Sequence, residues 1–385
     1  MSTLNERHTL AEQVAQAMGK SVYNNVEAHK DITPRLELQQ KSPKLMTLEE
    51  AIRHSGLKDG MTISFHHHFR GGDKVVNMVV AKLAEMGFKG LHLAASSLQD
   101  VHEPLIEHIR NGVITEISTS GLRGELAKEI SHGLMEKPVV FRSHGGRGEA
   151  IASGELHIDV AFLGASSSDP LGNACGYSRS ENAKSICGSL GYALPDAHYA
   201  DKVVILTDDL VPYPNTPNSI SEHDVDYVVE VESVGDSSKI ASGAIRDTKN
   251  PRDILLAQQA AKVIVNSGYF KNGFSIQTGS GGASLAAVKY IRQSMIDQDI
   301  KASFALGGIT AHMVKMHEEG LIERLIDVQS FDKVAAESLK NDPKHKEVSA
   351  CEYASMHEQG AATHYLDIVI LSALEVDVNF NVNVL

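Results

Sequence analysis

Apolar runs alternate along this chain with segments in which apolar residues recur at helical spacing. Short β-branched runs predict strands, and the helical spacing predicts amphipathic helices. We expect strands at residues 60–65, 90–95, 114–117, 139–142, 157–163, 201–206 and 227–234. We expect helices at residues 73–86, 105–109, 124–134 and 254–267. This alternation predicts an α/β fold with mostly parallel sheets that are flanked by helices on both faces.

Residues 272–310 are predicted to form a strand, a glycine loop, a helix, a second strand and a glycine turn. The glycine loop contains Gly279, Ser280, Gly281 and Gly282, where missing side chains allow a ligand to approach the backbone. The helix after the loop directs free N–H groups at it, which favours phosphate or developing negative charge. A glycine-rich turn that binds nothing is the alternative.

The second half of the chain repeats the first at a nearly constant offset, which indicates two tandem α/β units. Residues 157–165 can be laid on residues 365–373 without a gap. Three pairs of polar residues then correspond: Asp159 with Asp367, Asp169 with Asp377, and Asn173 with Asn381. The first unit continues for about sixty residues after its asparagine, whereas the second stops soon after Asn381. We therefore expect a shortened second sheet with an uncovered edge.

We expect three regions along the chain. Residues 1–45 are polar and form an N-terminal arm, residues 46–235 form a first α/β domain, and residues 236–385 form a second, incomplete one. Thr47 and Glu50 have capping-box spacing and predict a helix start within the first domain.

Composition narrows the possible functions. The formal charge of -13 argues against bulk binding of nucleic acid or of an anionic membrane, and no apolar run is long enough to span a bilayer. The three cysteines have no C-x-x-C spacing, and the N-terminus has no apolar signal segment. We expect a cytoplasmic protein that forms a homo-oligomer.

Five motifs closely resemble one known family, the alpha subunit of bacterial citrate lyase, over nearly the whole chain. The motifs are FHHHFRGGD at 65–73, GASSSDPLGNACG at 164–176, YALP at 192–195, QTGSGGAS at 277–284 and ALGGITAHM at 305–313. The resemblance implies two tandem CoA-transferase-like units and a citrate CoA-transferase. It also implies a family whose members extend beyond Leu385.

The resemblance further implies partners. The thiol is the CoA-like phosphopantetheine group of a small acyl carrier protein, the gamma subunit, so no cofactor is tightly bound to this chain. The alpha subunit exchanges acetate for citrate on that thiol, and the beta subunit then cleaves the citryl thioester. Related transferases use a carrier glutamate, but the corresponding stretch here, residues 306–309, contains none. Without it, the resemblance predicts a mixed citric–acetic anhydride.

Candidate site residues follow from that chemistry. Backbone N–H groups at Gly307, Gly308 and Gly281 are candidates for stabilising the oxyanion, and residues 279–282 for binding the thioester arm. Citrate carries three carboxylates, which suit the fork of arginine. The candidates for citrate binding are Arg70, Arg142, His66, His68 and Ser166, with Arg147 as a third arginine.

Alternatives remain open at this stage. His66, His67 and His68 lack the spacing and the carboxylate of a zinc site, so we predict no metal. A transferase that uses free CoA and another short acid is one alternative, and a non-catalytic scaffold form of the subunit is another. A sugar-phosphate isomerase would fit the fold class, but fold alone is weak evidence of function.

Overall fold

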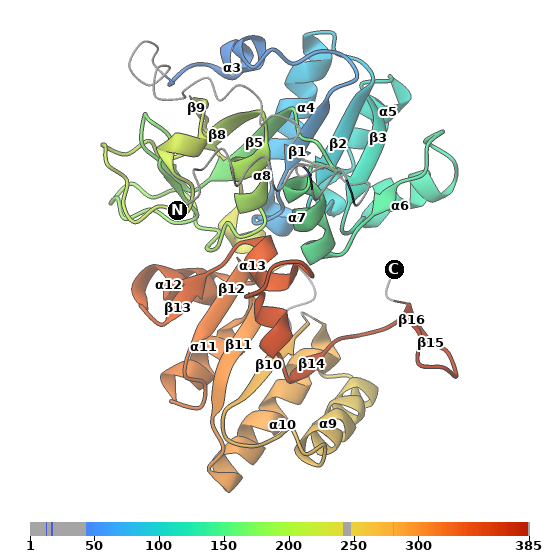
Figure 1. Ribbon diagram of the computed structural model, residues 1–385, viewed down its shortest axis with the longest axis vertical. Helices are drawn as coiled ribbons and strands as arrows, with labels where there is room; N and C mark the ends of the chain where they lie inside the picture. Colours follow the sequence, from blue (N-terminus) through green and yellow to red (C-terminus); the bar gives the residue numbers. More distant parts are fainter. Residues whose placement is uncertain (1–12, 14–16, 18–43, 242–247, 280, 384–385) are drawn as a thin grey trace. The chain divides into compact units, whose positions relative to one another are not determined.

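Seven parallel strands form the largest sheet among the described residues (Figure 1). A computed structural model describes residues 13, 17, 44–241, 248–279 and 281–383. The sheet order is β4-β3-β2-β1-β5-β8-β9. Its strands are β1 (Thr62–Phe65), β2 (Leu91–Ala95), β3 (Ile114–Thr119), β4 (Val140–Phe141), β5 (Val160–Ala165), β8 (Lys202–Thr207) and β9 (Tyr227–Glu230).

The helices of this half include those expected at residues 73–86, 105–109 and 124–134, whose apolar faces pack on the sheet, and also two that were not predicted, at residues 144–152 and 194–199. The capping box predicted at Thr47 and Glu50 is confirmed at the start of the first of them. They are α3 (Leu48–His54), α4 (Val75–Glu85), α5 (Leu105–Arg110), α6 (Gly124–Ser131), α7 (His144–Ala152) and α8 (Leu194–Tyr199).

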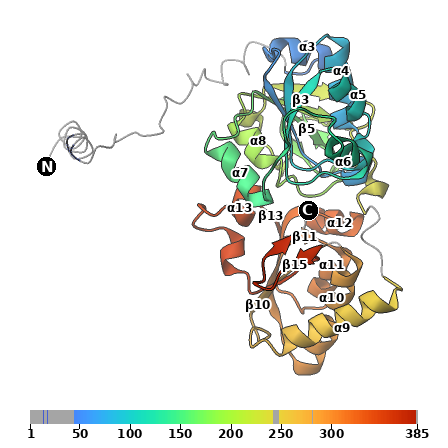
Figure 2. The ribbon, with the colours of Figure 1, turned by 90° about the vertical axis from the view of Figure 1, so that its right-hand side faces the viewer.

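Five parallel strands in the order β13-β12-β11-β10-β14 form the second sheet. They are β10 (Phe274–Thr278), β11 (Ala302–Ile309), β12 (Leu325–Ser330), β13 (His345–Glu347) and β14 (Ile368–Ile370). The helices are α9 (Pro251–Val265), α10 (Gly282–Gln298), α11 (Ala311–Glu318), α12 (Lys333–Asn341) and α13 (Ala350–Ala354). α9 and α10 pack side by side (Figure 2), and Gln258 donates to the Tyr290 hydroxyl between them at 3.1 Å. The predicted α/β fold with mostly parallel sheets is therefore confirmed.

The internal repeat reappears in the hydrogen bonds. The carboxylate of Asp159 accepts from the Thr62 N–H at 2.8 Å, and that of Asp367 accepts from the Ser275 N–H at 3.0 Å. Each therefore binds the N–H at the beginning of a central strand.

Each half also contains a small antiparallel hairpin, after β5 in the first half and after β14 in the second. These are β6 (Ser167–Ser168) with β7 (Ala174–Cys175), and β15 (Glu375–Val376) with β16 (Val382–Asn383). In both hairpins an asparagine donates to the aspartate four residues before it, at 2.8 Å for Asn173 and 2.7 Å for Asn381.

The halves differ at one sheet edge. In the first sheet β5 is covered by β8 and β9, but β14 is the last strand of the second sheet. The β6–β7 hairpin is buried, whereas Val378 and Phe380 between β15 and β16 are 94% and 85% exposed. The uncovered edge that the repeat predicted is therefore present in the described part of the chain.

Contacts divide the chain into Met1–Ser42 and Pro43–Leu385. Both sheets lie within Pro43–Leu385, and the boundary expected between residues 235 and 236 stays a prediction. Nearly all of the predicted N-terminal arm lies outside the described residues. Tyr192, from the first half, packs in one hydrophobic cluster with Phe304 and Val328 of the second.

Candidate functional site

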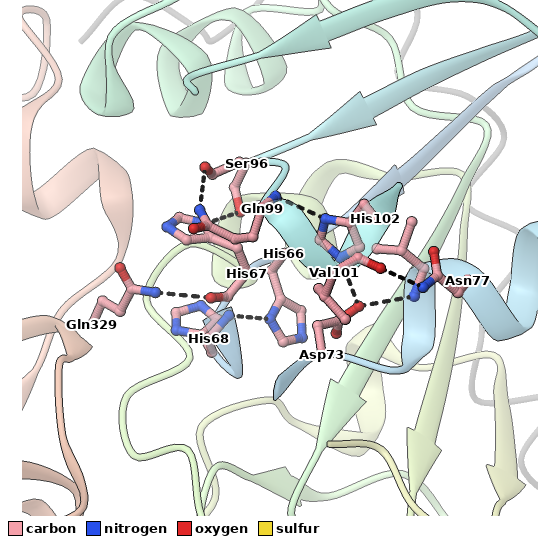
Figure 3. Close-up of polar contacts among 12 residues, drawn as sticks. His66, His67, His68, Asp73, Asn77, Ser96, Gln99, Val101, His102 and Gln329 are labelled. Carbon is pink, nitrogen blue, oxygen red and sulfur yellow. Dashed lines mark hydrogen bonds and ion pairs between the residues drawn. The ribbon is translucent and has the colours of Figure 1, made fainter. Parts of the chain in front are cut away.

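Polar side chains gather at the carboxyl end of β1, where residues 66–70 leave the sheet (Figure 3). Ligands of open α/β sheets bind at this end of the strands. His66, His67, His68 and Arg70 are all buried there. Residues from β12 in the second half approach the same segment, so the site draws on both halves of the repeat.

The segment is anchored to its neighbour after β2 by a buried hydrogen bond between Asp73 and His102 (Figure 3). The Asp73 carboxylate accepts from the Val76 N–H and from His102 Nε2, both at 3.1 Å. His102 Nδ1 accepts from the Gln99 N–H at 2.9 Å, which places the ring proton on Nε2. The position of residues 66–73 is therefore held by hydrogen bonds that need no ligand.

His66 uses both ring nitrogens inside the protein. Its Nε2 donates to the Gly164 carbonyl at 2.8 Å, and its Nδ1 accepts from the His68 N–H at 3.4 Å. Burial lowers the pKa of His66, which keeps the ring neutral. His66, predicted to contact citrate, thus has no free ring nitrogen for a ligand.

His68 differs from His66, because neither of its ring nitrogens has a hydrogen-bond partner among the described residues. The ring is 0% exposed, and burial holds its pKa well below the usual range. A buried polar atom without a partner is costly and calls for an explanation. A ligand that hydrogen-bonds to His68 would supply one.

Three histidine rings surround the ring of Tyr192. The ring centroids of His144, His67 and His68 lie 4.7, 5.1 and 5.8 Å from that of Tyr192. Burial lowers the pKa of His144 to about 4, holds that of His67 well below its usual range, and raises the pKa of Tyr192 well above its own. The cluster is therefore uncharged at neutral pH.

Arg70 is the buried cation of the site. Its guanidinium lies 4.5 Å from the centroid of the Phe331 ring, and its Nη1 has no hydrogen-bond partner among the described residues. Burial, and secondarily Arg123, lowers the pKa of Arg70 to about 10, so the group remains charged at pH 7. No described carboxylate pairs with it, which leaves its charge for an anionic ligand.

The other two candidate arginines are already paired. Arg147 is buried and makes a bidentate pair with Asp196 at 2.7 and 2.8 Å. Arg142 donates to Glu155 at 2.8 Å, and this glutamate is 67% exposed. Arg70 is therefore distinguished from both by its lack of an acidic partner.

Ser166 follows β5 and is fully buried. Its hydroxyl is directed at the Cys187 sulfur, 3.7 Å away. This contact does not join Ser166 to His68 or Arg70.

The glycine loop forms as predicted between β10 and α10. Gly281 is the N-cap of α10, and Gly282 is the first helical residue. The Gly279 N–H donates to the Ile370 carbonyl at 2.8 Å, so this donor is used within the sheet. Ser280 lies outside the described residues. Contacts of the loop run to residues 370–372 rather than to the histidines.

Gly307 and Gly308 were expected to end a strand, but β11 continues through both of them to Ile309. The register with β12 shifts between the two glycines, which is a β-bulge, and Gly307 has a positive φ of 95°. The structure also gives Gly308 a packing reason, because a Cβ there would overlap the Phe331 ring. The strand boundary was wrong because a bulge leaves the ladder intact on both sides.

One cluster of possible metal ligands exists among the described residues, formed by His157, Asp159 and Asp201. It precedes β5 and β8 and therefore lies at the amino ends of the strands, away from Arg70. Asp159 already holds the Thr62 N–H. The histidines at 66–68 are not part of this cluster.

Sequence reasoning missed Tyr192, His144, Gln329 and Phe331. Tyr192 belongs to the YALP motif and His144 directly precedes Gly145 and Gly146, but neither residue had an assigned role. Gln329 and Phe331 lie at the end of buried strand β12, and the rule that ligands bind at carboxyl ends was the available signal.

Comparisons with known proteins agree over most of the chain. Residues 42–385 match the family model "Citrate lyase, alpha subunit (CitF)". The chain belongs to this family. A citrate lyase alpha chain from Haemophilus influenzae is 59% identical over 367 residues, which are 95% of this chain and 72% of the relative. The alpha subunit is the CoA-transferase subunit of the multi-subunit citrate lyase.

Solved structures support the fold. The putative alpha subunit of citrate lyase from Streptococcus mutans, in complex with citrate, is 58% identical with a TM-score of 0.85 and covers 89% of this chain and 67% of that one. A malonate decarboxylase alpha subunit from Acinetobacter baumannii has a TM-score of 0.67 at 15% identity, covering 91% of this chain and 64% of that one, so it shows only the CoA-transferase-like fold. Over the described residues, no helix is long and apolar enough to cross a membrane.

Proposed function

We propose that this chain exchanges acetate for citrate on the thioester of an acyl carrier protein. Acetyl carrier and citrate would give citryl carrier and acetate. The proposal rests on two groups of residues 66–70 that have no hydrogen-bond partner among the described residues, Nη1 of the buried Arg70 and the ring nitrogens of His68. A guanidinium binds a carboxylate with charge-assisted hydrogen bonds. The neutral histidine rings can donate further hydrogen bonds to the ligand, and they add no positive charge that would repel Arg70. The citrate named in the 58% identical Streptococcus mutans structure supports the same ligand.

The reaction would proceed through an anhydride, because Leu306, Gly307 and Gly308 offer no carrier carboxylate. One citrate carboxylate attacks the acetyl carbonyl, and the thiolate leaves with the electron pair of the C–S bond. The thiolate then attacks the citryl carbonyl of the mixed anhydride, and acetate departs. Arg70 would hold a carboxylate of citrate that does not react, which supplies proximity and orientation. The backbone of Gly281, Gly307 and Gly308 remains our candidate for stabilising the oxyanion.

The thiol would belong to a phosphopantetheine arm on a partner acyl carrier protein, the gamma subunit, with no cofactor held tightly by this chain. The glycine loop at Gly281 and Gly282 begins helix α10, whose free N–H groups suit such an arm. A beta subunit would then cleave the citryl thioester, and we propose a homo-oligomeric arrangement of this chain within the complex.

The test is acyl exchange by the purified chain. Acetyl-CoA as a surrogate thioester and isotopically labelled citrate are mixed with the protein, and citryl thioester is sought by mass spectrometry. Labelled citryl thioester supports the transferase proposal. Exchange with another short acid but not with citrate would favour the free-CoA transferase. Retained binding of beta and carrier subunits without any exchange would favour the scaffold form.

A further inference from the structure

The segment that carries Arg70 is hydrogen-bonded to the carboxyl end of β12. The side-chain amide of Gln329 donates to the His67 carbonyl at 2.9 Å, as Figure 3 shows. The same carbonyl accepts from the Arg70 N–H at 2.9 Å. This carbonyl therefore has two donors, one from its own turn and one from the other half of the chain.

Arg70 needs this support because its backbone is in the left-handed region, with φ of 50°. Such a conformation is uncommon outside glycine, asparagine and aspartate, and it persists only where surrounding structure fixes it. The conformation turns the guanidinium toward β12, where it meets the face of Phe331.

Phe331 in turn depends on Gly308. A Cβ built on Gly308 would overlap the far end of the Phe331 ring, at Cζ and the two Cε atoms. The absence of a side chain at Gly308 thus gives the ring its place. Three residues from three segments form a contiguous stack, with Gly308 beneath Phe331 and Phe331 beneath Arg70.

We propose that Phe331 is a positioning residue that orients the Arg70 guanidinium toward the substrate carboxylate. In this proposal the lack of a side chain at Gly308 provides the space that the Phe331 ring occupies. The inference rests on the proposed function, because it names what orients the anion-binding group of that site. A cation over an aromatic face is held in a defined plane, and the outward edge of the guanidinium then remains available for two parallel hydrogen bonds.

Kinetics of acyl exchange test the role of the ring. Phe331→Leu keeps an apolar side chain but removes the aromatic face, and it should raise the KM for citrate about 3- to 30-fold, with kcat at saturating citrate changed by less than about twofold. Phe331→Tyr keeps the face and should restore the parent KM. A parent-like KM in Phe331→Leu would overturn the proposal.

A double variant tests the role of Gly308. Gly308→Ala should raise the citrate KM because its methyl group displaces the ring. Leucine lacks the ring atoms that the methyl group would meet, so Gly308→Ala/Phe331→Leu should be no worse than Phe331→Leu alone. If the increase in citrate KM of the double variant equals the product of the increases in the two single variants, Gly308 does not act through Phe331. A direct backbone contact between Gly308 and the substrate would then be favoured.

Two further measurements separate this inference from the proposed function. Tyr177→Leu is a matched control, because Arg179 lies 5.4 Å over Tyr177 in a pair that does not contact Arg70, and its citrate KM should stay at the parent value. Modification of Arg70 by phenylglyoxal, followed by peptide mass spectrometry, needs no substrate. Faster modification of Arg70 in Phe331→Leu than in the parent supports the contact between Arg70 and Phe331, whether or not the parent exchanges citrate. A parent that does not exchange citrate would overturn only the proposed function. Equal rates would overturn the stack.

Discussion

At the scale of single residues, the site is defined by which polar atoms lack partners. Arg70, Arg142 and Arg147 are equivalent in the sequence, since each lies near glycines at a predicted strand end. In the structure Arg147 and Arg142 have acidic partners, whereas Arg70 has none among the described residues. The burial of an unpaired charge is tolerated where a ligand completes the pair.

Substitution of Arg70 should therefore weaken citrate binding more than substitution of Arg142. We expect Arg70→Ala to raise the citrate KM by about 10- to 100-fold, because charge-assisted hydrogen bonds are lost. Arg142→Ala removes a solvent-accessible pair with Glu155 and should change it by less than about twofold. Steady-state exchange kinetics measure both. Equal effects of the two substitutions would contradict the assignment of Arg70.

The neutral histidines make folding sensitive to acid. Burial lowers the pKa of His144 to about 4, below the value of about 6.5 expected in the unfolded chain. The unfolded state therefore binds a proton first, so stability present above pH 6.5 is lost as the pH falls from 6.5 toward 4. His144→Phe keeps a ring that cannot titrate, and it should reduce the loss between pH 7 and pH 5 by on the order of 1–2 kcal/mol.

Urea unfolding at the two pH values measures this change in the free energy of unfolding. The exposed His132 at the end of α6 provides the control, and His132→Phe should keep the pH dependence of the parent. A parent-like acid loss in His144→Phe would mean that protonation of this ring does not limit stability.

At the scale of elements, the repeat builds the same local structures in two different environments. The Asp-to-Asn hairpin closes by the same hydrogen bonds in both halves. In the first half it packs beneath β8 and its following loop, where the Asn215 N–H also donates to Asp169 at 2.9 Å. In the second half its apolar residues are exposed, next to the open edge of β14.

An open edge and an apolar hairpin favour association between molecules. We expect a polypeptide of residues 1–385 to self-associate as its concentration rises, and Val378→Asn/Phe380→Asn to reduce this association. Asparagine also tolerates the positive φ of 63° at Phe380. Analytical ultracentrifugation measures the effect, and Val334→Asn, an exposed valine on α12, is the control. A parent that sediments as one species at all concentrations would show that this surface is not adhesive.

At the scale of the whole molecule, the two halves meet through close backbone contacts as well as through the site. The Ser189 hydroxyl donates to the Asp327 carbonyl at 2.9 Å, and the Ser189 N–H donates to Ser330 at 3.2 Å. Gly188 lies directly against Ser330, where a Cβ would overlap the serine side chain. These contacts bring β12 to the segment that carries Arg70.

Gly188→Ala should therefore lower the free energy of unfolding of residues 43–385, the unit that contains both sheets. Its φ is 79°, and Gly154, with φ of 80° and nothing within 4 Å of its Cβ position, is a matched control for backbone strain alone. We expect Gly154→Ala to cost about 1 kcal/mol and Gly188→Ala about 2–4 kcal/mol of unfolding free energy in urea. Equal losses would show that the halves can separate there without cost.

Sequence alone was sufficient for the parts of this protein that depend on local order. The strands and helices that were predicted, the capping box at Thr47, the repeat and the family motifs are properties of neighbouring or regularly spaced residues. The helices at residues 144–152 and 194–199 were not predicted. Periodicity reports which face of an element is buried, so the α/β fold followed from it. The bulge at Gly307 and Gly308 was not predicted, because an extra residue in one strand does not change the pattern of apolar residues along the sequence.

Only the tertiary structure decided which candidates form the site. Three contacts decide the roles of the candidates: Arg147 pairs with Asp196, both ring nitrogens of His66 are hydrogen-bonded, and Arg70 stacks on Phe331. These contacts join residues that are 2 to 261 positions apart in the sequence. Hydrogen-bond satisfaction and burial depend on what surrounds an atom in space, and neither is encoded in local periodicity. The sequence specifies the candidate groups one by one. Where the two halves meet, Arg70 has no acidic partner and the His68 ring has no hydrogen bond among the described residues.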